Sequence, residues 1–382
     1  MGDCMYGFPG SGKGRGRMVP DLSRRQLLGA GAAMGSAVVL GACGDDEKPA
    51  AGGGGDSAQD LGVDAITIAN WGGTTADGMM RAWAEPFTKQ TGVKVNQVSP
   101  VDYGKVRSQV ESDKVTWDWI DAEGWFPFGN PDLVEKLDMD FIGVTEADIL
   151  DDIPSSVRPD GIASYVTAYV IAYSSERDGG HPKNWQEFFD PKAIPGKRSI
   201  YNWPYGMVDI VLLGDGVPYE DLYPLDLDRA FNKLDSMRDD LMFFNTGAES
   251  QQQLVSGSAD FLSPWNNRVG YLAQGGLPVA IEWTDAMLIG AYHVVIKGSK
   301  AKRATEQFIK TALEPQNQAD MALYSGYAPT RKDAIDLVDE KVRPWLPTQE
   351  DNLGKSAGFL NDEWWGANLS DVSAKWTEWA SS

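Results

Sequence analysis

The chain has 382 residues, of which 55 are acidic and 34 basic, and its formal net charge at pH 7 is −21. The first 42 residues hold five of the basic and two of the acidic residues, so the remainder carries a net charge of −24. So acidic a surface disfavours nucleic acid and anionic lipid as partners, because both carry negative charge. After position 43 the chain has no cysteine, so we expect a body of about 320 residues that its core stabilises without a disulfide.

Residues 23–43 follow the order of an export signal. Ser23-Arg24-Arg25-Gln26-Leu27-Leu28 reads as a twin-arginine motif, and the apolar residues 27–40 are too few for a membrane-spanning helix, which needs about 20. Leu40-Gly41-Ala42-Cys43 has the form of a lipobox. We predict that residues 1–42 are a leader and signal peptide and that the Cys43 thiol is acylated. The protein would then be periplasmic or anchored at the outer face of the cytoplasmic membrane. The alternative is a buried apolar helix with a chance cysteine.

Two further segments near the N-terminus are predicted to carry no site of their own. Residues 7–14 nearly match a P-loop, but Gly14 stands where Ser or Thr would bind magnesium, and the segment precedes the export signal. We interpret it as a basic leader. Residues 43–62 are acidic and rich in glycine and alanine, which predicts a flexible tether between the lipid and the body.

The body alternates strand and helix patterns from residue 63 onward. The first predicted strands are 63–69, 93–95 and 117–121, with helices at 76–90 and 103–113 between them. This order is typical of an α/β sheet, whose ligands collect at the carboxyl ends of the strands. Residues 165–173 are predicted to cross to a second lobe, which continues in residues 185–262. Residues 292–296 are predicted to be a strand that returns to the first lobe.

Residue types that carry chemistry are sparse, apart from carboxylates. The chain has only two histidines, His181 in a predicted loop and His293 in an apolar run, where a structural role is the commoner one. We find no metal-ligand spacing, nucleophile elbow or histidine-containing triad. We therefore expect no catalytic residue, metal or cofactor and do not expect an enzyme. A hydrolase that uses two carboxylates, such as Glu123 and Asp285, is the alternative from another class.

Short motifs along the body resemble those of one family. They are Asn70-Trp71, Phe87-Thr88-Lys89-Gln90-Thr91-Gly92-Val93-Lys94-Val95, Asn184-Trp185-Gln186-Glu187-Phe188-Phe189-Asp190-Pro191 with Ile194-Pro195-Gly196-Lys197-Arg198, and Ser325-Gly326-Tyr327-Ala328-Pro329-Thr330. In this order they resemble the spermidine/putrescine-binding proteins of ABC importers, within the extracellular solute-binding group. The resemblance covers nearly the whole body.

The resemblance implies the periplasmic-binding-protein fold of type II. In this α/β fold each of two lobes is a sheet flanked by helices, and the ligand lies in the cleft between them. We place the parts of the chain at residues 63–168 (lobe I, first part), 169–288 (lobe II), 289–330 (return to lobe I) and 331–382 (C-terminal helical segment). Closure of the lobes around the ligand would be a hinge motion.

The resemblance also implies a pocket with aromatic walls and carboxylates. The positions of the family, together with side chains beside strand ends, give the candidate ligand-binding residues Trp71, Glu123, Trp125, Trp203, Trp265, Asp285, Tyr292 and Tyr327. The paired acids of the family fall near residues 203–206 and 289–291, where this chain has none. Asp209 and Asp285 are the candidate replacements, and Glu123 and Asp121 are the candidates for a negative charge from the other lobe.

These features predict a lipid-anchored substrate-binding protein of an ABC importer. Its ligand is expected to be a small organic solute, polyamine-like or another cationic or amphipathic amine, because stacked aromatic rings attract cations by about 0.5–2 kcal/mol each. Aromatic rings also stack on sugars, so a sugar receptor is the alternative within the same class. The expected partners are the permease subunits and the membrane, through Cys43, and the protein is expected to be a monomer.

Overall fold

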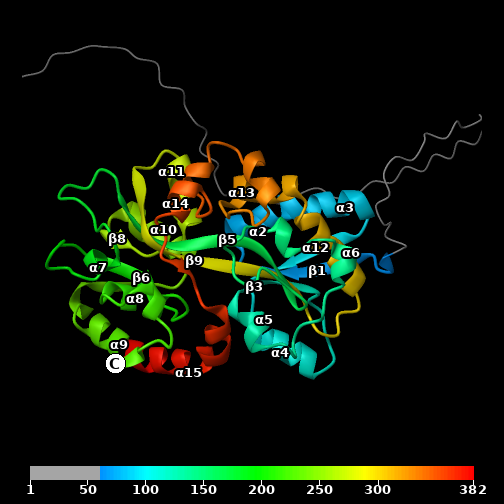
Figure 1. The fold of residues 1–382 in the computed structure, drawn as a ribbon, viewed down its shortest axis with the longest axis horizontal. Helices are drawn as coiled ribbons and strands as arrows, with labels where there is room; N and C mark the ends of the chain where they lie inside the picture. Colours follow the sequence, from blue (N-terminus) through cyan, green and yellow to red (C-terminus); the bar gives the residue numbers. More distant parts are fainter. Residues whose placement is uncertain (1–60) are drawn as a thin grey trace, which may run out of the picture. The chain divides into compact units, whose positions relative to one another are not determined.

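The computed structural model describes residues 61–382 (Figure 1). The export signal, the P-loop-like segment, the lipidation site at Cys43 and most of the predicted tether therefore lie outside the described residues. Leu61, which the sequence analysis assigned to the tether, is only 6% exposed and packs in the hydrophobic core. The packed body thus includes residues before position 63.

One ten-stranded sheet runs through the body in the order β2-β1-β3-β9-β5-β8-β6-β7, with β4 and β10 paired at its side. Its strands are β1 (Ala65–Ala69), β2 (Lys94–Val98), β3 (Trp119–Glu123), β4 (Val157–Arg158), β5 (Gly161–Ser174), β6 (Arg198–Tyr201), β7 (Leu241–Phe244), β8 (Phe261–Leu262), β9 (Val279–Val295) and β10 (Gly358–Phe359). Strands β1, β2 and β3 are parallel and define the first lobe. Strands β6, β7 and β8 are likewise parallel and define the second lobe.

The long antiparallel strands β5 and β9 belong to both lobes and connect them. Strand β5 is buried except at its last two residues, and β9 is buried from Ala286 onward, which suits aromatic and β-branched side chains. The predicted return strand at residues 292–296 is only the end of β9, which begins at Val279. The first part of β9 was not predicted because Glu282, Thr284 and Asp285 interrupt its apolar pattern. These polar residues lie where the pairing of β9 with β5 is irregular.

Helices of the first lobe cover the sheet around β1 and β3 (Figure 1). They are α2 (Gly73–Met79), a π-helical turn (Met80–Ala84), α3 (Glu85–Thr91), α4 (Tyr103–Glu111), α5 (Trp125–Gly129), α6 (Met139–Ile142), α12 (Lys302–Ala312) and α13 (Pro315–Ser325). The Asp102 side chain caps α4 by accepting from the Lys105 N–H at 2.9 Å. The rings of Trp83, Trp119 and Phe308 meet beneath these helices and form the centre of this core.

The second lobe has its own helices, and their hydrophobic cluster continues into α4 and α5 of the first lobe. The helices are α7 (Trp185–Phe188), α8 (Met207–Gly214), α9 (Leu227–Asp235), α10 (Gly247–Ser256) and α11 (Asn266–Gln274). Every residue of α8 is buried, and all of them except Asp209 are apolar, as expected of a helix inside a core. Asp226 and Thr246 cap α9 and α10 by accepting backbone N–H bonds, which positions the start of α10 beside the end of β7.

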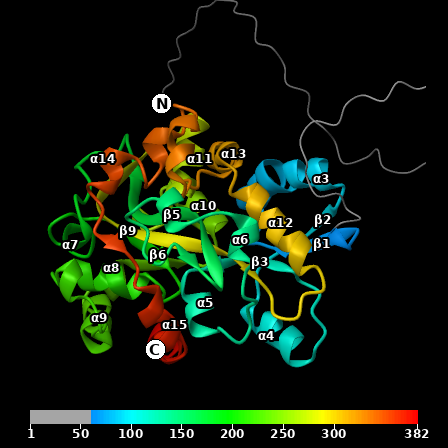
Figure 2. The same cartoon turned by 45° about the vertical axis from the view of Figure 1, so that its right-hand side comes forward.

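The C-terminal segment connects the lobes a third time. It contains the helices α14 (Glu350–Leu353) and α15 (Asp362–Ser381). The remaining described elements are short 3-10 turns at Glu146–Asp148, Tyr219–Asp221, Arg238–Asp240, Lys332–Leu337 and Arg343–Trp345. Both views place α15 along the underside, between α5 of the first lobe and the helices of the second (Figure 2). No helix within residues 61–382 is both long and apolar enough to span a membrane.

Candidate functional site

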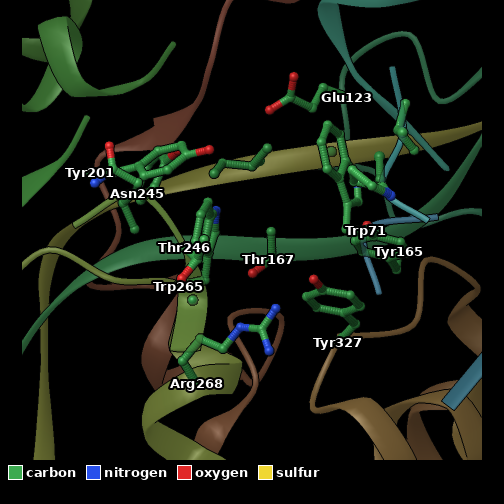
Figure 3. Close-up of a pocket in the computed structure, with 17 residues that line it drawn as sticks. Trp71, Glu123, Tyr165, Thr167, Tyr201, Asn245, Thr246, Trp265, Arg268 and Tyr327 are labelled. Atoms are coloured by element: carbon green, nitrogen blue, oxygen red, sulfur yellow. The ribbon is translucent and has the colours of Figure 1, made fainter. Parts of the chain in front are cut away.

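A cavity of about 400 Å³ lies between the two lobes (Figure 3). The first lobe contributes Trp71, just after β1, and Glu123, the last residue of β3. The second lobe contributes Tyr201 at the end of β6 and Trp265 after β8. Both lobes thus turn the carboxyl ends of their parallel strands toward one space, which is where ligands bind in open α/β sheets.

The connecting strands form the floor of the cavity. Alternate residues of β5 line it, namely Tyr165, Thr167 and Tyr169, because successive side chains of a strand point to opposite faces. The facing part of β9 offers the small residues Gly290 and Ala291, which leave room above the sheet.

Aromatic rings from both lobes and from β5 line the cavity. The rings of Tyr165 and Tyr327 are stacked, with centroids 4.0 Å apart and planes 1° from parallel. Trp71 meets Tyr103 edge-on at 6.0 Å and is 37% exposed, so it lies at the rim. Trp265 crosses Tyr201 at 4.7 Å. Such walls pack well on the methylene groups of a ligand and favour a positive charge.

Glu123 is the one acidic residue among the described residues that line the cavity. Its Oε2 accepts hydrogen bonds from Trp125 Nε1 at 2.9 Å and from the Tyr103 hydroxyl at 3.5 Å. Tyr103 in turn accepts the Glu123 backbone N–H at 3.0 Å. Burial disfavours the charged form and raises the pKa of Glu123 to about 7, although both hydrogen bonds oppose this shift. Both side-chain bonds hold the same oxygen, so Oε1 is left for a ligand.

Arg268 is the one basic residue among the described lining residues. It belongs to α11, and its Nη1 donates to Thr74 Oγ1 of α2 at 3.3 Å, so the two lobes touch at this edge. Its Nε is buried and has no hydrogen-bond partner in the described part of the chain. A Cβ at Gly247 would overlap this guanidinium, so a larger residue there would displace the Arg268 side chain from its present position.

Figure 3 shows the Glu123 carboxylate and the Arg268 guanidinium on opposite sides of the cavity. Neither forms an ion pair with another residue in the range 61–382. One charge of each sign is therefore available to a ligand, with aromatic surface between them. The described residues contain no group of three or more His, Cys, Asp or Glu that could hold a metal ion.

Comparison with known proteins identifies the family. Residues 82–348 match the family described as bacterial extracellular solute-binding protein. The chain belongs to this family. The γ-aminobutyric acid (GABA)-binding protein of Pseudomonas aeruginosa is 29% identical over 327 residues, which is 83% of this chain and 91% of that protein.

Solved structures with the same fold include two receptors with a stated ligand. A GABA receptor is 36% identical, covers 82% of this chain and 97% of its own, and superposes with a TM-score of 0.77. The binding protein AgtB of A. tumefaciens R10, in complex with agropinic acid, is 28% identical, covers 83% and 99%, and has a TM-score of 0.73. The predicted two-lobed fold of type II is thereby confirmed. These comparisons support the wider solute-binding family and do not single out the spermidine/putrescine group.

This solute-binding protein therefore works outside the cytoplasm as a component of an ABC importer, and its relatives are receptors. The structure brings together four of the eight side chains that the sequence singled out: Trp71, Glu123, Trp265 and Tyr327. The other four, Trp125, Trp203, Asp285 and Tyr292, do not line the cavity. Each has a physical reason for its position.

Two of these four lie behind the site. Trp125 is 7% exposed and supports Glu123 from behind through its indole N–H. Tyr292 follows the lining residue Ala291, so strand alternation turns it to the opposite face of β9. There its hydroxyl donates to the Pro154 carbonyl at 3.0 Å.

The other two belong to different surroundings. Trp203 packs against a hydrophobic cluster that the second lobe shares with α4 and α5 of the first lobe. Asp285 lies where the pairing of β9 is interrupted, with a φ of 60°, and its N–H donates to the Lys355 carbonyl at 2.8 Å. Asp209, the other candidate replacement for the missing acids, is fully buried in α8 and accepts from the Tyr223 hydroxyl. Neither acid provides a negative charge inside the cavity.

The sequence analysis missed Arg268 and the three tyrosines Tyr165, Tyr169 and Tyr201, all of which line the cavity. Arg268 stands three residues after Trp265, and no motif marks it. Tyr165 and Tyr169 were part of an apolar run whose inner face was unknown. The hydroxyl of Tyr165 donates to Asp121 Oδ1 at 2.9 Å, and Asp121 is fully buried, with its pKa raised by burial to about 7. Asp121 thus orients one wall of the cavity from below.

Proposed function

We propose that this protein captures a small zwitterion of the GABA class, with an ammonium group near one end and a carboxylate near the other. The observation that carries the proposal is the pairing of Arg268 with Glu123 across an otherwise uncharged, aromatic cavity. Arg268 would bind the ligand carboxylate in the forked geometry that guanidinium groups favour. Glu123 Oε1 would bind the ammonium, and the rings between would pack on the carbon chain.

The same charges argue against a polyamine. A polyamine carries an ammonium group at each end, so one of them would lie near Arg268 without a compensating acid, and leaving a buried charge unpaired costs several kcal/mol. A hydrolase with two carboxylates is also disfavoured, because Glu123 has no second acid beside it among the described lining residues. The relatives named for GABA, at 29% and 36% identity, support the zwitterion.

The anchor and the partners complete the proposal. Acylation of Cys43 would keep the receptor at the outer face of the cytoplasmic membrane, next to the permease subunits that receive the ligand. Residues 63–168 and 289–330 would form one lobe and residues 169–288 the other, closing around the ligand as a monomer. The C-terminal segment 331–382 would remain packed on both.

Isothermal titration calorimetry of the purified protein tests the ligand class. GABA should bind, whereas butylamine and butyrate, each of which lacks one charged group, should bind at least tenfold more weakly. Putrescine and glucose serve as the polyamine and sugar comparisons. Tighter binding of putrescine than of GABA would contradict the proposal.

A further inference from the structure

The C-terminal helix α15 contacts both halves of the site from behind. On the first-lobe side, the Asp362 carboxylate lies against Gly124, the residue after Glu123, so closely that a Cβ there would overlap it. One turn on, Gly366 meets Gly129 of α5, and a Cβ on Gly366 would lie 2.7 Å from the Gly129 nitrogen. These glycine contacts allow the two backbones to approach and fix α15 relative to Glu123.

On the second-lobe side, α15 reaches the cavity through a chain of hydrogen bonds. Trp376 Nε1 donates to Asn202 Oδ1 at 3.1 Å. The Asn202 amide then donates to Asn245 Oδ1 at 3.0 Å. Asn245 lines the cavity, and Asn202 directly follows the lining residue Tyr201. One side chain of α15 therefore supports the second-lobe wall.

Asp362 also connects the lobes by itself. Its Oδ1 accepts a 2.6 Å hydrogen bond from Tyr205, a fully buried residue of the second lobe, while its other oxygen contacts Gly124 of the first. Among the described side chains of α15, Asp362 alone contacts both the Tyr205 hydroxyl of the second lobe and Gly124, the residue next to Glu123.

We infer that Asp362 and Trp376 are positioning residues of the ligand site, which align Glu123 in one lobe with Asn245 in the other through α15. The inference rests on the proposed function for its ligand, but the contacts that carry it do not involve a ligand. The helix thus does more than complete the core of the second lobe.

The charged surroundings of Glu123 make the role of Asp362 measurable. Three kinds of ionisable group surround Glu123 and Asp362. The acids are Asp121 on β3 and Asp209 on α8, and the base is Arg158. The tyrosines are Tyr103 on α4, Tyr169 on β5, Tyr292 on β9, and Tyr201, Tyr205 and Tyr223 of the second lobe. Burial raises the pKa of Asp362 to about 7, and the nearby charge of Glu123 adds to this shift. The same interaction must act in return on Glu123.

Substitutions on α15 separate positioning from packing. Trp376→Phe keeps an aromatic ring at this position but removes the indole N–H that bonds to Asn202, and it should weaken GABA binding roughly threefold to tenfold. Trp379→Phe is the matched control, because it removes a similar bond from the same helix to Asp235, at 2.8 Å, which does not lead to the cavity. Equal affinities of the two variants, with equal thermal stability, would overturn the role of Trp376.

Asp362→Asn keeps the shape of the side chain and removes its charge. NMR titration of the Glu123 carboxyl in the unliganded protein should show its pKa lowered by about half a unit or more. An unchanged Glu123 titration overturns the role of Asp362 whether or not GABA binds. Failure of the wild-type protein to bind GABA, by contrast, would count against the proposed ligand and leave this titration as the deciding result.

Discussion

Replacement of Arg268 by methionine is the sharpest test of how the cavity recognises a ligand. The substitution keeps an unbranched side chain of similar length but removes the only positive charge among the described lining residues. In the structure the guanidinium has a buried Nε without a partner and one long bond, 3.3 Å, to Thr74. The Nε packs against Gly247, so Nη2 and the second N–H of Nη1 are the donors left for a carboxylate.

The expected magnitude follows from that geometry. A hydrogen bond to a charged group contributes about 1.5–3 kcal/mol, and loss of one partner of a desolvated ion pair costs about 2–5 kcal/mol. We expect a loss near 2–4 kcal/mol for Arg268→Met, which is about a 30- to 1,000-fold rise in Kd for GABA. The existing bond to Thr74 is long, so its loss adds little.

Calorimetry with two ligands and two variants isolates the effect. Butylamine has no carboxylate, so Arg268→Met should leave its weak binding unchanged or improve it. Arg81→Met is the matched control, because Arg81 lies 3.7 Å over the Tyr324 ring, away from the cavity. If Arg268→Met bound GABA as tightly as the wild type, or weakened GABA and butylamine equally, the assignment of the carboxylate to Arg268 would be refuted.

Three further predictions concern pH and the anchor. The pKa of Glu123 is about 7, and an ammonium group binds its ionised form, so the affinity for GABA should fall about tenfold from pH 8 to pH 6 in calorimetry. The Glu123→Gln variant should bind GABA weakly and with the same affinity at both pH values. A pH dependence that is unchanged in this variant would exclude Glu123 as its cause. The carboxyls with a pKa raised to about 7 are Asp121, Glu123, Asp209 and Asp362. The folded state therefore holds more protons than the unfolded state between about pH 4 and 7, so the Tm of the unliganded protein should rise as the pH is lowered from 8 to 5; a scanning-calorimetry Tm that fell over this range would contradict their burial. Cys43→Ser should move the exported protein from the membrane fraction to the soluble fraction, and membrane association that survives this change would rule out an anchor at Cys43.

The sequence alone was sufficient for the alternation of strands and helices in the first lobe and for two side chains at the ends of its strands. Trp71 and Glu123 directly follow or end short apolar runs, and parallel strands bring such ends to one edge whatever the details of packing. The resemblance and the local turns pointed to Trp265 and Tyr327, and both side chains line the cavity. Local pattern is enough for these positions because they depend only on where a strand stops.

Other positions depended on which face of an element meets the cavity. Tyr292 and Ala291 are neighbours in β9, and only the pairing of β9 with β5 decides that Ala291 faces the ligand and Tyr292 the opposite side. A shift by one residue would exchange them, because side chains of a strand alternate. The irregular pairing between Ala163 and Tyr165 sets this register, and no sequence pattern announces it.

The charge that supports the proposed ligand was visible only in three dimensions. Composition showed an acidic protein, and the motifs suggested an amine. Arg268 lies in the first turn of α11, which begins at Asn266. Its guanidinium reaches the cavity because Gly247, at the start of α10, leaves space for it. The sequence by itself determined the class of the fold and one acidic end of the site. Tertiary packing decided the basic end, since it depends on two segments that meet only when the second lobe is folded.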